Sequence, residues 1–205
     1  MKYLLRPLLF MALISLTGCL DENSKDRLDE QQVYTTDKDV YVNAVVTLYN
    51  YIGGDKDSEG LQGTYRGVYD YNTFTTDEAI IPIRGGDWYD GGFWADLYTH
   101  NWAEDSKPLY DTWKYLYKVI VFSNDGLSTI ERHKQLLTDE QYKTYKAEVR
   151  AIRALYYYYL MDMFGNIPLV TTVNEDTENA EQASRPEVYK FIVKELQEVA
   201  PLLPT

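Results

Sequence analysis

The residues best suited to binding chemistry lie between positions 76 and 102. This segment contains three of the four tryptophans and two Gly-Gly pairs. Glycine permits tight turns and close approach of the backbone to a ligand. Indole and phenol rings can stack on the apolar face of a sugar ring, and polar side chains can bond its hydroxyls. We therefore predict a site for a neutral glycan, formed by Arg84, Asp87, Trp88, Tyr89, Trp94, Asn101 and Trp102.

Two other interpretations of this segment stay open. The tryptophans could instead pack the loop onto helices, because large aromatic side chains are mostly buried. Acid pairs such as Asp77/Glu78 and Asp87/Asp90 could form the dyad of a glycoside hydrolase. However, a chain with 32 acidic residues makes such pairs by chance. Glu78 and Asp87 equally suit helix caps, turns or weak calcium ligation.

Other catalytic chemistry has little support in the sequence. The chain has two histidines, His100 and His133, which are too few for most His-based metal sites. His133 has charged neighbours at the end of a predicted helix, so we expect it on the solvated surface. No phosphate-binding loop, serine elbow or zinc-helix motif occurs. We expect no catalytic residues, no metal and no cofactor.

The N-terminus carries a different chemical signal. Lys2 and Arg6 precede an apolar run, residues 8–16, that is too short to span a bilayer. This run leads into Leu16-Thr17-Gly18-Cys19, which matches the lipobox of bacterial lipoproteins. We predict a signal peptide at residues 1–18, lipidation of Cys19 and an acidic tether at residues 19–36. The alternative is an ordinary signal peptide with an incidental cysteine.

The charge balance restricts the class of partner. The formal net charge is −12. Removal of residues 1–18 takes away Lys2 and Arg6 and no acid, which leaves −14. Phosphate binding needs basic patches, so nucleic acid is disfavoured as a partner. An electrostatic grip on anionic lipid is disfavoured for the same reason.

Apolar spacing predicts four helices that must position the aromatic segment. They cover residues 37–52, 108–130, 138–163 and 184–200. Three of them begin with a capping-box pattern, in which a Ser or Thr is followed three residues later by an acid or Gln. These pairs are Thr36/Asp39, Thr138/Gln141 and Ser184/Glu187.

Four further expectations concern local structure. The tyrosines at 156–159 surround their helix, so we expect cover on more than one side. Asn124 lies on an apolar stripe, and we expect a partly buried amide bonded to nearby backbone. The stretch between Gly53 and Lys107 is expected to be loop-rich, with helical periodicity only at 63–72. Residues 167–173 are expected to be extended.

The predicted fold class is mostly α. Consecutive helices indicate helix pairs like those of tetratricopeptide repeats, although the spacing departs from a 34-residue period. The fourth helix has no partner after it, so we expect a partial fold over residues 37–205 with an incomplete C-terminal part.

Several motifs in order resemble those of the SusD/RagB family of outer-membrane nutrient-binding lipoproteins. The most specific is an Arg-Ala-aromatic helix at 148–156, followed by Phe164-Gly165-Asn166-Ile167-Pro168-Leu169. The lipobox, the 77–94 segment and Arg185-Pro186-Glu187 extend the resemblance across the chain. Members of this family are substantially longer, so the resemblance is to its N-terminal half.

The resemblance implies a function and a location. Such proteins bind glycans, or in some cases peptides, at the cell surface and pass them to a SusC-like TonB-dependent transporter. They are binding proteins, not enzymes, and are held at the outer membrane by their lipid. A helical scaffold that binds a partner chain and no sugar is the remaining alternative.

Overall fold

The computed structural model describes residues 29–54, 60–61, 67–173 and 180–204. The chain divides into two units, residues 1–35 and 36–205. The predicted signal peptide, Cys19 and most of the predicted tether lie outside the described residues. In the first unit, α2 (Glu30–Val33) is a single helical turn. The backbone N–H of Asp29 donates to Oε1 of Gln32 at 3.2 Å and closes the start of this turn.

The second unit is mostly helical, as predicted. Its helices are α3 (Asp37–Tyr41), α4 (Thr47–Gly53), α5 (Val68–Phe74), α6 (Phe93–Thr99), α7 (Lys107–Arg132), α8 (Asp139–Phe164) and α9 (Arg185–Val199). A π-helical turn, η1 (Val42–Val46), joins α3 to α4, and 3₁₀ turns occur at η2 (Asp90–Gly92), η3 (Lys134–Leu136) and η4 (Ala200–Leu202). The strands β1 (Ile167–Pro168) and β2 (Gln182–Ala183) pair antiparallel, with Ile167 opposite Ala183.

The predicted helix starts are confirmed by their capping bonds. The hydroxyl of Thr138 accepts from the backbone N–H of Gln141 at 3.2 Å, and the Gln141 side chain accepts from the N–H of Thr138 at 2.9 Å. The N–H of Ser184 donates to Glu187 at 2.8 Å in the same way. Each reciprocal pair satisfies backbone donors that a helix end leaves free. These caps fix where α8 and α9 begin.

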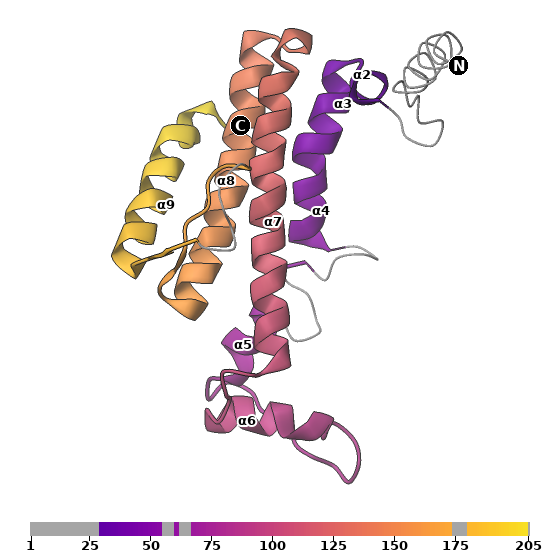
Figure 1. The fold of residues 1–205 in the computed structure, drawn as a ribbon. Helices are drawn as coiled ribbons and strands as arrows, with labels where there is room; N and C mark the ends of the chain where they lie inside the picture. Colours follow the sequence, from indigo (N-terminus) through magenta and orange to yellow (C-terminus); the bar gives the residue numbers. More distant parts are fainter. Residues whose placement is uncertain (1–28, 55–59, 62–66, 174–179, 205) are drawn as a thin grey trace, which may run out of the picture. The chain divides into compact units, whose positions relative to one another are not determined.

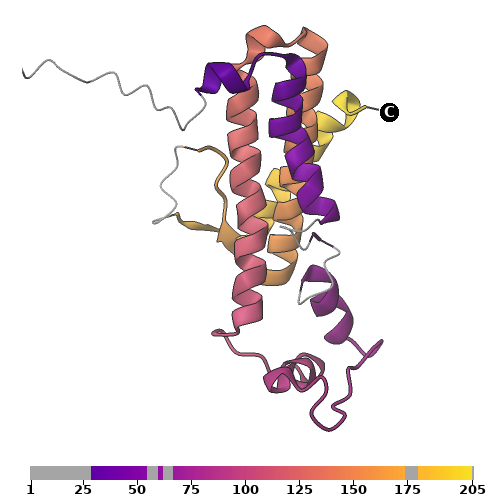
Figure 2. The ribbon, with the colours of Figure 1, turned by 90° about the vertical axis from the view of Figure 1, so that its right-hand side faces the viewer.

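The helices α7 and α8 form an antiparallel hairpin, and α9 and the segment from α3 to α4 pack against it (Figure 1). The helix α9 lies along α8, and α3 to α4 runs along α7; the view turned by 90° shows the same arrangement (Figure 2). The short helices α5 and α6 lie beside the N-terminal end of α7 in both views. The finer likeness to tetratricopeptide repeats stays a prediction.

The helix α8 is covered on more than one side, as its tyrosines predicted. Tyr156 and Tyr157 are fully buried, whereas Tyr158 is 46% exposed. Tyr157 donates to the carbonyl of Val170 at 2.6 Å and accepts from the N–H of Val170 at 2.9 Å. Its phenol therefore fastens the segment after β1 to α8.

The π-helical turn η1 packs closely against α7. A Cβ at Gly126 would lie 2.8 Å from the carbonyl oxygen of Ala44, so only glycine allows this approach. The hydroxyl of Thr47 donates to the carbonyl of Val42, five residues back, at 3.1 Å. The absence of a side chain at Gly126 lets the wider turn sit against α7.

A buried carboxylate on α8 bonds to side chains of α3 and α4. Glu148 is 4% exposed and accepts hydrogen bonds from the phenols of Tyr49, at 2.9 Å, and Tyr41, at 3.4 Å. Burial and the bond to Glu148 raise the pKa of Tyr49 to about 12. The phenol therefore stays a donor at neutral pH and satisfies a charge that would otherwise be costly to bury.

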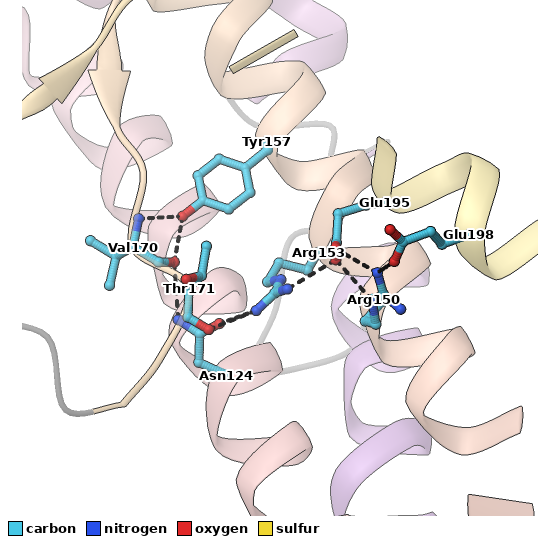
Figure 3. A network of polar contacts seen from close by, with 8 residues as sticks. All are labelled: Asn124, Arg150, Arg153, Tyr157, Val170, Thr171, Glu195 and Glu198. Carbon is cyan, nitrogen blue, oxygen red and sulfur yellow. Dashed lines mark hydrogen bonds and ion pairs between the residues drawn. The ribbon is translucent and has the colours of Figure 1, made fainter. Parts of the chain in front are cut away.

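A network of buried charges connects α7, α8 and α9 (Figure 3). Arg153 donates to Oδ1 of Asn124 at 2.8 Å, to the carbonyl of Thr171 at 2.8 Å and to Glu195 at 2.9 Å. Arg150 donates to the same Glu195 at 2.7 and 3.1 Å. Asn124 also donates to the carbonyl of Val170 at 3.1 Å, which confirms its predicted structural role.

The prediction for His133 is wrong. Its side chain is 8% exposed, and its Nδ1 lies 3.0 Å from the carbonyl of Thr129. His133 caps the C-terminal end of α7, and its ring bonds to the preceding turn of that helix, where it is buried. The charged neighbours in sequence gave no sign of this bond.

The stretch from 53 to 107 contains more helix than predicted. The helix α5 overlaps the expected 63–72 segment, but its described start is at Val68. The helix α6 and the turn η2 were not predicted. Gly91 and Gly92 precede α6 with φ of 68° and 91°, and these glycines indicated a loop. The extended segment expected at 167–173 forms β1 in its first two residues.

Candidate functional site

A tight turn presents the two charged side chains of the predicted site. Arg84 and Asp87 form an isolated antiparallel bridge, with backbone N–H to carbonyl distances of 3.3 and 3.1 Å. Gly85 between them has φ of +64°, a conformation that favours glycine. The side chains of Arg84 and Asp87 are exposed. The turn therefore holds a cation and an anion in solvent, three residues apart.

The next two residues form an exposed aromatic platform. Trp88 is 60% exposed and Tyr89 is 55% exposed. Trp88 and Asp90 have φ of +57° and +40°, which costs a residue with a side chain roughly 1–2 kcal/mol each. Backbone strain of this kind gathers at binding and catalytic sites. The strained backbone keeps two large rings turned toward solvent.

Trp94 supports this platform from below. It is 3% exposed, and its Nε1–H donates to Oδ2 of Asp90 at 2.7 Å. Its ring meets that of Trp88 edge-on at 6.4 Å and that of Phe74 at 5.2 Å. With Tyr71 and Leu97 it forms a small hydrophobic cluster. Trp94 thus has no free ring face for a ligand, and its packing role corresponds to the alternative that the sequence left open.

The end of α6 presents the remaining predicted residues. His100 ends the helix with φ of +56°, and the N–H of Asn101 donates to the carbonyl of Asp96 at 2.8 Å. Trp102 follows, 46% exposed. Asn101 and Trp102 line a pocket of about 250 Å³ together with Asp96 and other residues from both ends of α6.

The structure therefore gathers the predicted residues into two groups. Arg84, Asp87, Trp88 and Tyr89 share the turn before α6, whereas Asn101 and Trp102 share the pocket after it. Gly91 and Phe93 also line this pocket, which brings its wall to the end of the aromatic platform. Both groups are fixed by the same short helix, so α6 is the element that positions the site.

In its described part, the structure shows little that would support metal binding or glycoside hydrolysis. Among the described residues, no three His, Cys, Asp or Glu side chains cluster as a metal site would need. The side chains of Glu78 and Asp87, each a member of one acid pair considered for a hydrolase, are exposed. The N–H of Glu78 donates to the hydroxyl of Thr76 at 3.2 Å, as in a turn.

Two residues of this region were not among the predicted site residues. Tyr98, on the outer face of α6, is 44% exposed and adds a ring near the platform's helix. His100 lies edge-on to Trp102, with ring centroids 5.5 Å apart, and its Nε2 lies 2.7 Å from the carbonyl of Thr75. A carbonyl only accepts, so Nε2 carries a proton. The spacing of Phe93, Trp94 and Leu97 was the signal for α6.

Comparison with known proteins assigns the chain to a family. A SusD-like family model, described as starch-binding and associating with the outer membrane, matches residues 28–205. The chain belongs to this SusD-like family. The recognition made from the sequence motifs is therefore confirmed.

Curated relatives of this SusD-like chain are substantially longer. The starch-binding protein SusD of Bacteroides thetaiotaomicron is 27% identical over 192 residues, covering 88% of this chain and 31% of SusD. A SusD-like protein of Bacteroides ovatus is 26% identical over 137 residues, covering 64% of this chain and 24% of that protein. The chain thus spans about a quarter to a third of the length of these relatives.

Solved structures agree with the fold of the SusD-like chain. A laminarin-binding SusD-like protein is 26% identical with a TM-score of 0.66, and the match covers 83% of this chain and 35% of that one. A SusD superfamily protein of Bacteroides vulgatus has a TM-score of 0.67 at 20% identity, over 83% of this chain and 35% of that one. These matches confirm the mostly helical SusD-like fold.

Proposed function

We propose that this chain is a cell-surface lipoprotein that binds a neutral glycan and delivers it to a TonB-dependent transporter of the outer membrane. The single observation that carries the proposal is the exposed aromatic surface around α6, in a chain of the SusD-like family. Trp88, Tyr89 and Trp102 present 46–60% of their surface to solvent. Soluble monomeric proteins rarely expose large apolar patches unless these bind a partner or a ligand.

The chemistry of this surface suits a sugar. Ring faces of Trp88, Tyr89 and Trp102 stack on the C–H face of a pyranose. Arg84, Asp87 and Asn101 lie beside them in sequence and supply directional donors and acceptors for hydroxyl groups. A net charge of −12 disfavours highly anionic ligands. The ligand class that fits best is therefore a neutral oligosaccharide or polysaccharide.

The proposed anchor is a lipid on Cys19. The support is the lipobox at 16–19 and the family's association with the outer membrane. Among the described residues, no helix combines the length and the apolar composition needed to cross a membrane. A diacylglyceryl chain with a further acyl group would hold the chain at the membrane.

Delivery to a transporter is the second half of the proposal. A glycan held at the cell exterior enters the cell only through an outer-membrane pore, so a surface-bound capture protein needs one beside it. Co-purification of a TonB-dependent transporter with the tagged chain from detergent-solubilised outer membrane would support this step. Recovery of the chain without any such transporter would contradict it.

Affinity electrophoresis tests glycan binding. The chain should migrate more slowly in gels that contain a neutral polysaccharide it binds, with laminarin and starch as the first probes. Trp88→Ala and Trp102→Ala should each restore part of the mobility, because each ring contributes on the order of 1 kcal/mol. Tyr189→Ala is the matched control, since Tyr189 is 58% exposed but lies on α9.

The outcome also distinguishes glycan binding from the alternative of a helical scaffold that binds no sugar. Unchanged mobility of the wild-type chain across a panel of neutral polysaccharides would contradict glycan binding. Equal retardation of the wild type and both tryptophan variants would show that glycan binds elsewhere.

A further inference from the structure

A second pocket is also lined by Trp102 but otherwise by residues that were not predicted for the site. It has a volume of about 270 Å³. Its apolar wall includes Leu97, Trp102 and Phe164, and its polar groups come from Asn72, Thr75 and Asp162. Leu97 and Trp102 also line the pocket that contains Asn101. Elements distant in sequence, α5, α6 and the end of α8, therefore converge on one small cavity.

The walls of this pocket are held in place by other contacts. The ring of Phe164 meets that of Trp113 edge-on at 5.0 Å. Trp102 rests against His100, which bonds to the carbonyl of Thr75 at the end of α5. Leu97 is 1% exposed and belongs to the buried cluster beneath. A pocket whose walls are fixed in this way is preorganised for a ligand.

The polar groups of the pocket keep unused hydrogen-bonding capacity. Asn72 donates through Nδ2 to the carbonyl of Val68 at 2.9 Å, and its Oδ1 accepts no bond from the described part of the chain. Asp162 accepts from Arg185 at 3.3 Å through Oδ1, which leaves Oδ2 available within the described residues. The hydroxyl of Thr75 donates to the carbonyl of Tyr71 at 2.5 Å and can still accept.

We propose that this pocket binds one neutral sugar ring, either a free hexose or the terminal residue of an oligosaccharide. The inference rests on the proposed glycan function and adds recognition of a chain end to it. The volume is near the lower limit for ligand pockets, about 300 Å³, and so suits a single ring. Acceptors at Asn72, Thr75 and Asp162 suit hydroxyl donors, and the indole of Trp102 suits the C–H face.

The charge of the lining disfavours an anionic ring. Asp162 is the only ionisable carboxyl group in it, and the lining contains no Lys, Arg or His. A uronic acid would find no Lys, Arg or His in the lining to pair with its carboxylate, and the nearby Arg185 is already bonded to Asp162 at 3.3 Å. Glucuronate should therefore bind at least several-fold more weakly than glucose, although the two rings have nearly the same size.

The indole N–H signals in a ¹H–¹⁵N spectrum of the purified chain test this inference. The chain has four tryptophans, so single Trp→Phe variants assign the four signals. D-glucose, D-galactose and D-mannose are titrated in turn, followed by a neutral oligosaccharide that contains the same rings. At least one hexose should shift the Trp102 signal saturably and leave that of Trp88 unchanged.

A matched pair of variants controls for local folding. Asn72→Ala should weaken hexose binding about 3- to 10-fold, the loss expected for one hydrogen bond to a neutral ligand. Asn43→Ala is the control, because Asn43 is also exposed and its Nδ2 donates to the carbonyl four residues back, of Asp39, at 2.8 Å. It should leave hexose binding unchanged.

The outcomes separate this inference from the proposed function. If the oligosaccharide shifts the Trp88 signal and no hexose shifts that of Trp102, the pocket assignment is overturned while glycan binding stands. The same holds if Asn72→Ala and Asn43→Ala change hexose affinity equally. If no carbohydrate shifts either signal, both proposals fail.

Discussion

Replacement of Arg153 by Met should destabilise the second unit more than any single change at its surface. The side chain is 6% exposed, and its guanidinium makes three charge-assisted hydrogen bonds, to Asn124, the carbonyl of Thr171 and Glu195. Methionine keeps much of the length but removes the charge. Glu195, 9% exposed, then loses one of its two cationic partners.

The expected cost follows from what remains unpaired. Removing one partner of a buried ion pair typically costs about 3–5 kcal/mol. Arg150 still bonds to Glu195 at 2.7 Å, so we expect the lower end, about 3 kcal/mol. Arg150→Met is the matched variant. Its side chain is 23% exposed and Glu195 keeps Arg153, so the expected loss is about 1 kcal/mol.

Urea unfolding followed by tryptophan fluorescence and circular dichroism measures both losses. Coincident transitions establish two-state behaviour, and an unchanged slope assigns the effect to stability. The double variant Arg153→Met/Glu195→Met should lose less than the sum of its single variants by about 1–3 kcal/mol, because each single variant takes a bonded partner from the other residue and the double variant removes both. An Arg153→Met loss below about 1 kcal/mol, or no larger than that of Arg150→Met, would refute this reasoning.

Three further predictions concern the backbone, pH and the anchor. Gly126→Ala should lower the free energy of unfolding by about 1–3 kcal/mol in urea, because its Cβ would meet Ala44 at 2.8 Å; an unchanged midpoint would contradict the close packing. Burial alone would raise the pKa of Glu195, but bonds from Arg150 and Arg153 outweigh it and lower that pKa. The ionised Glu195 therefore contributes stability above its pKa in the unfolded chain, about 4.3. That contribution is lost as the pH falls through its lower pKa in the folded protein. Glu195→Gln should therefore flatten acid unfolding curves, and identical pH dependence would refute the assignment. Cys19→Ser should abolish labelling of the chain by radioactive palmitate in cells, and retained labelling would place the lipid elsewhere.

The long helices were predictable because their signals are local. Apolar residues every three or four positions predicted α7, α8 and α9, and the pairs Thr138/Gln141 and Ser184/Glu187 marked two of their starts. The structure confirms both capping boxes. Such signals need no knowledge of what packs against the helix.

The polar interior was not predictable, because its partners lie far apart in sequence. Arg153 and Glu195 are 42 residues apart, and the carbonyl of Thr171 comes from a third segment. A charged residue on a helix suggests solvent until its partner is known. The burial of His133 is likewise a tertiary property, which its charged neighbours in sequence do not reveal.

The candidate site was predicted in composition but not in layout. The sequence identified the aromatic residues around Gly85 to Trp102, and the structure exposes Trp88, Tyr89 and Trp102. It did not distinguish these from Trp94, whose bond to Asp90 and buried neighbours depend on the unpredicted helix α6. Exposure of an aromatic ring is a tertiary property that local spacing does not encode.

Calorimetric titration of the chain and its Trp88→Ala/Trp102→Ala variant with neutral oligosaccharides tests the central claim most directly. The account predicts saturable binding of at least one oligosaccharide by the wild type. At about 1 kcal/mol per ring, the double variant should bind about 30-fold more weakly. Its circular dichroism spectrum should be unchanged, because neither ring belongs to the buried core. Equal affinity of the folded variant and the wild type, or no binding by the wild type, would contradict glycan capture by these rings.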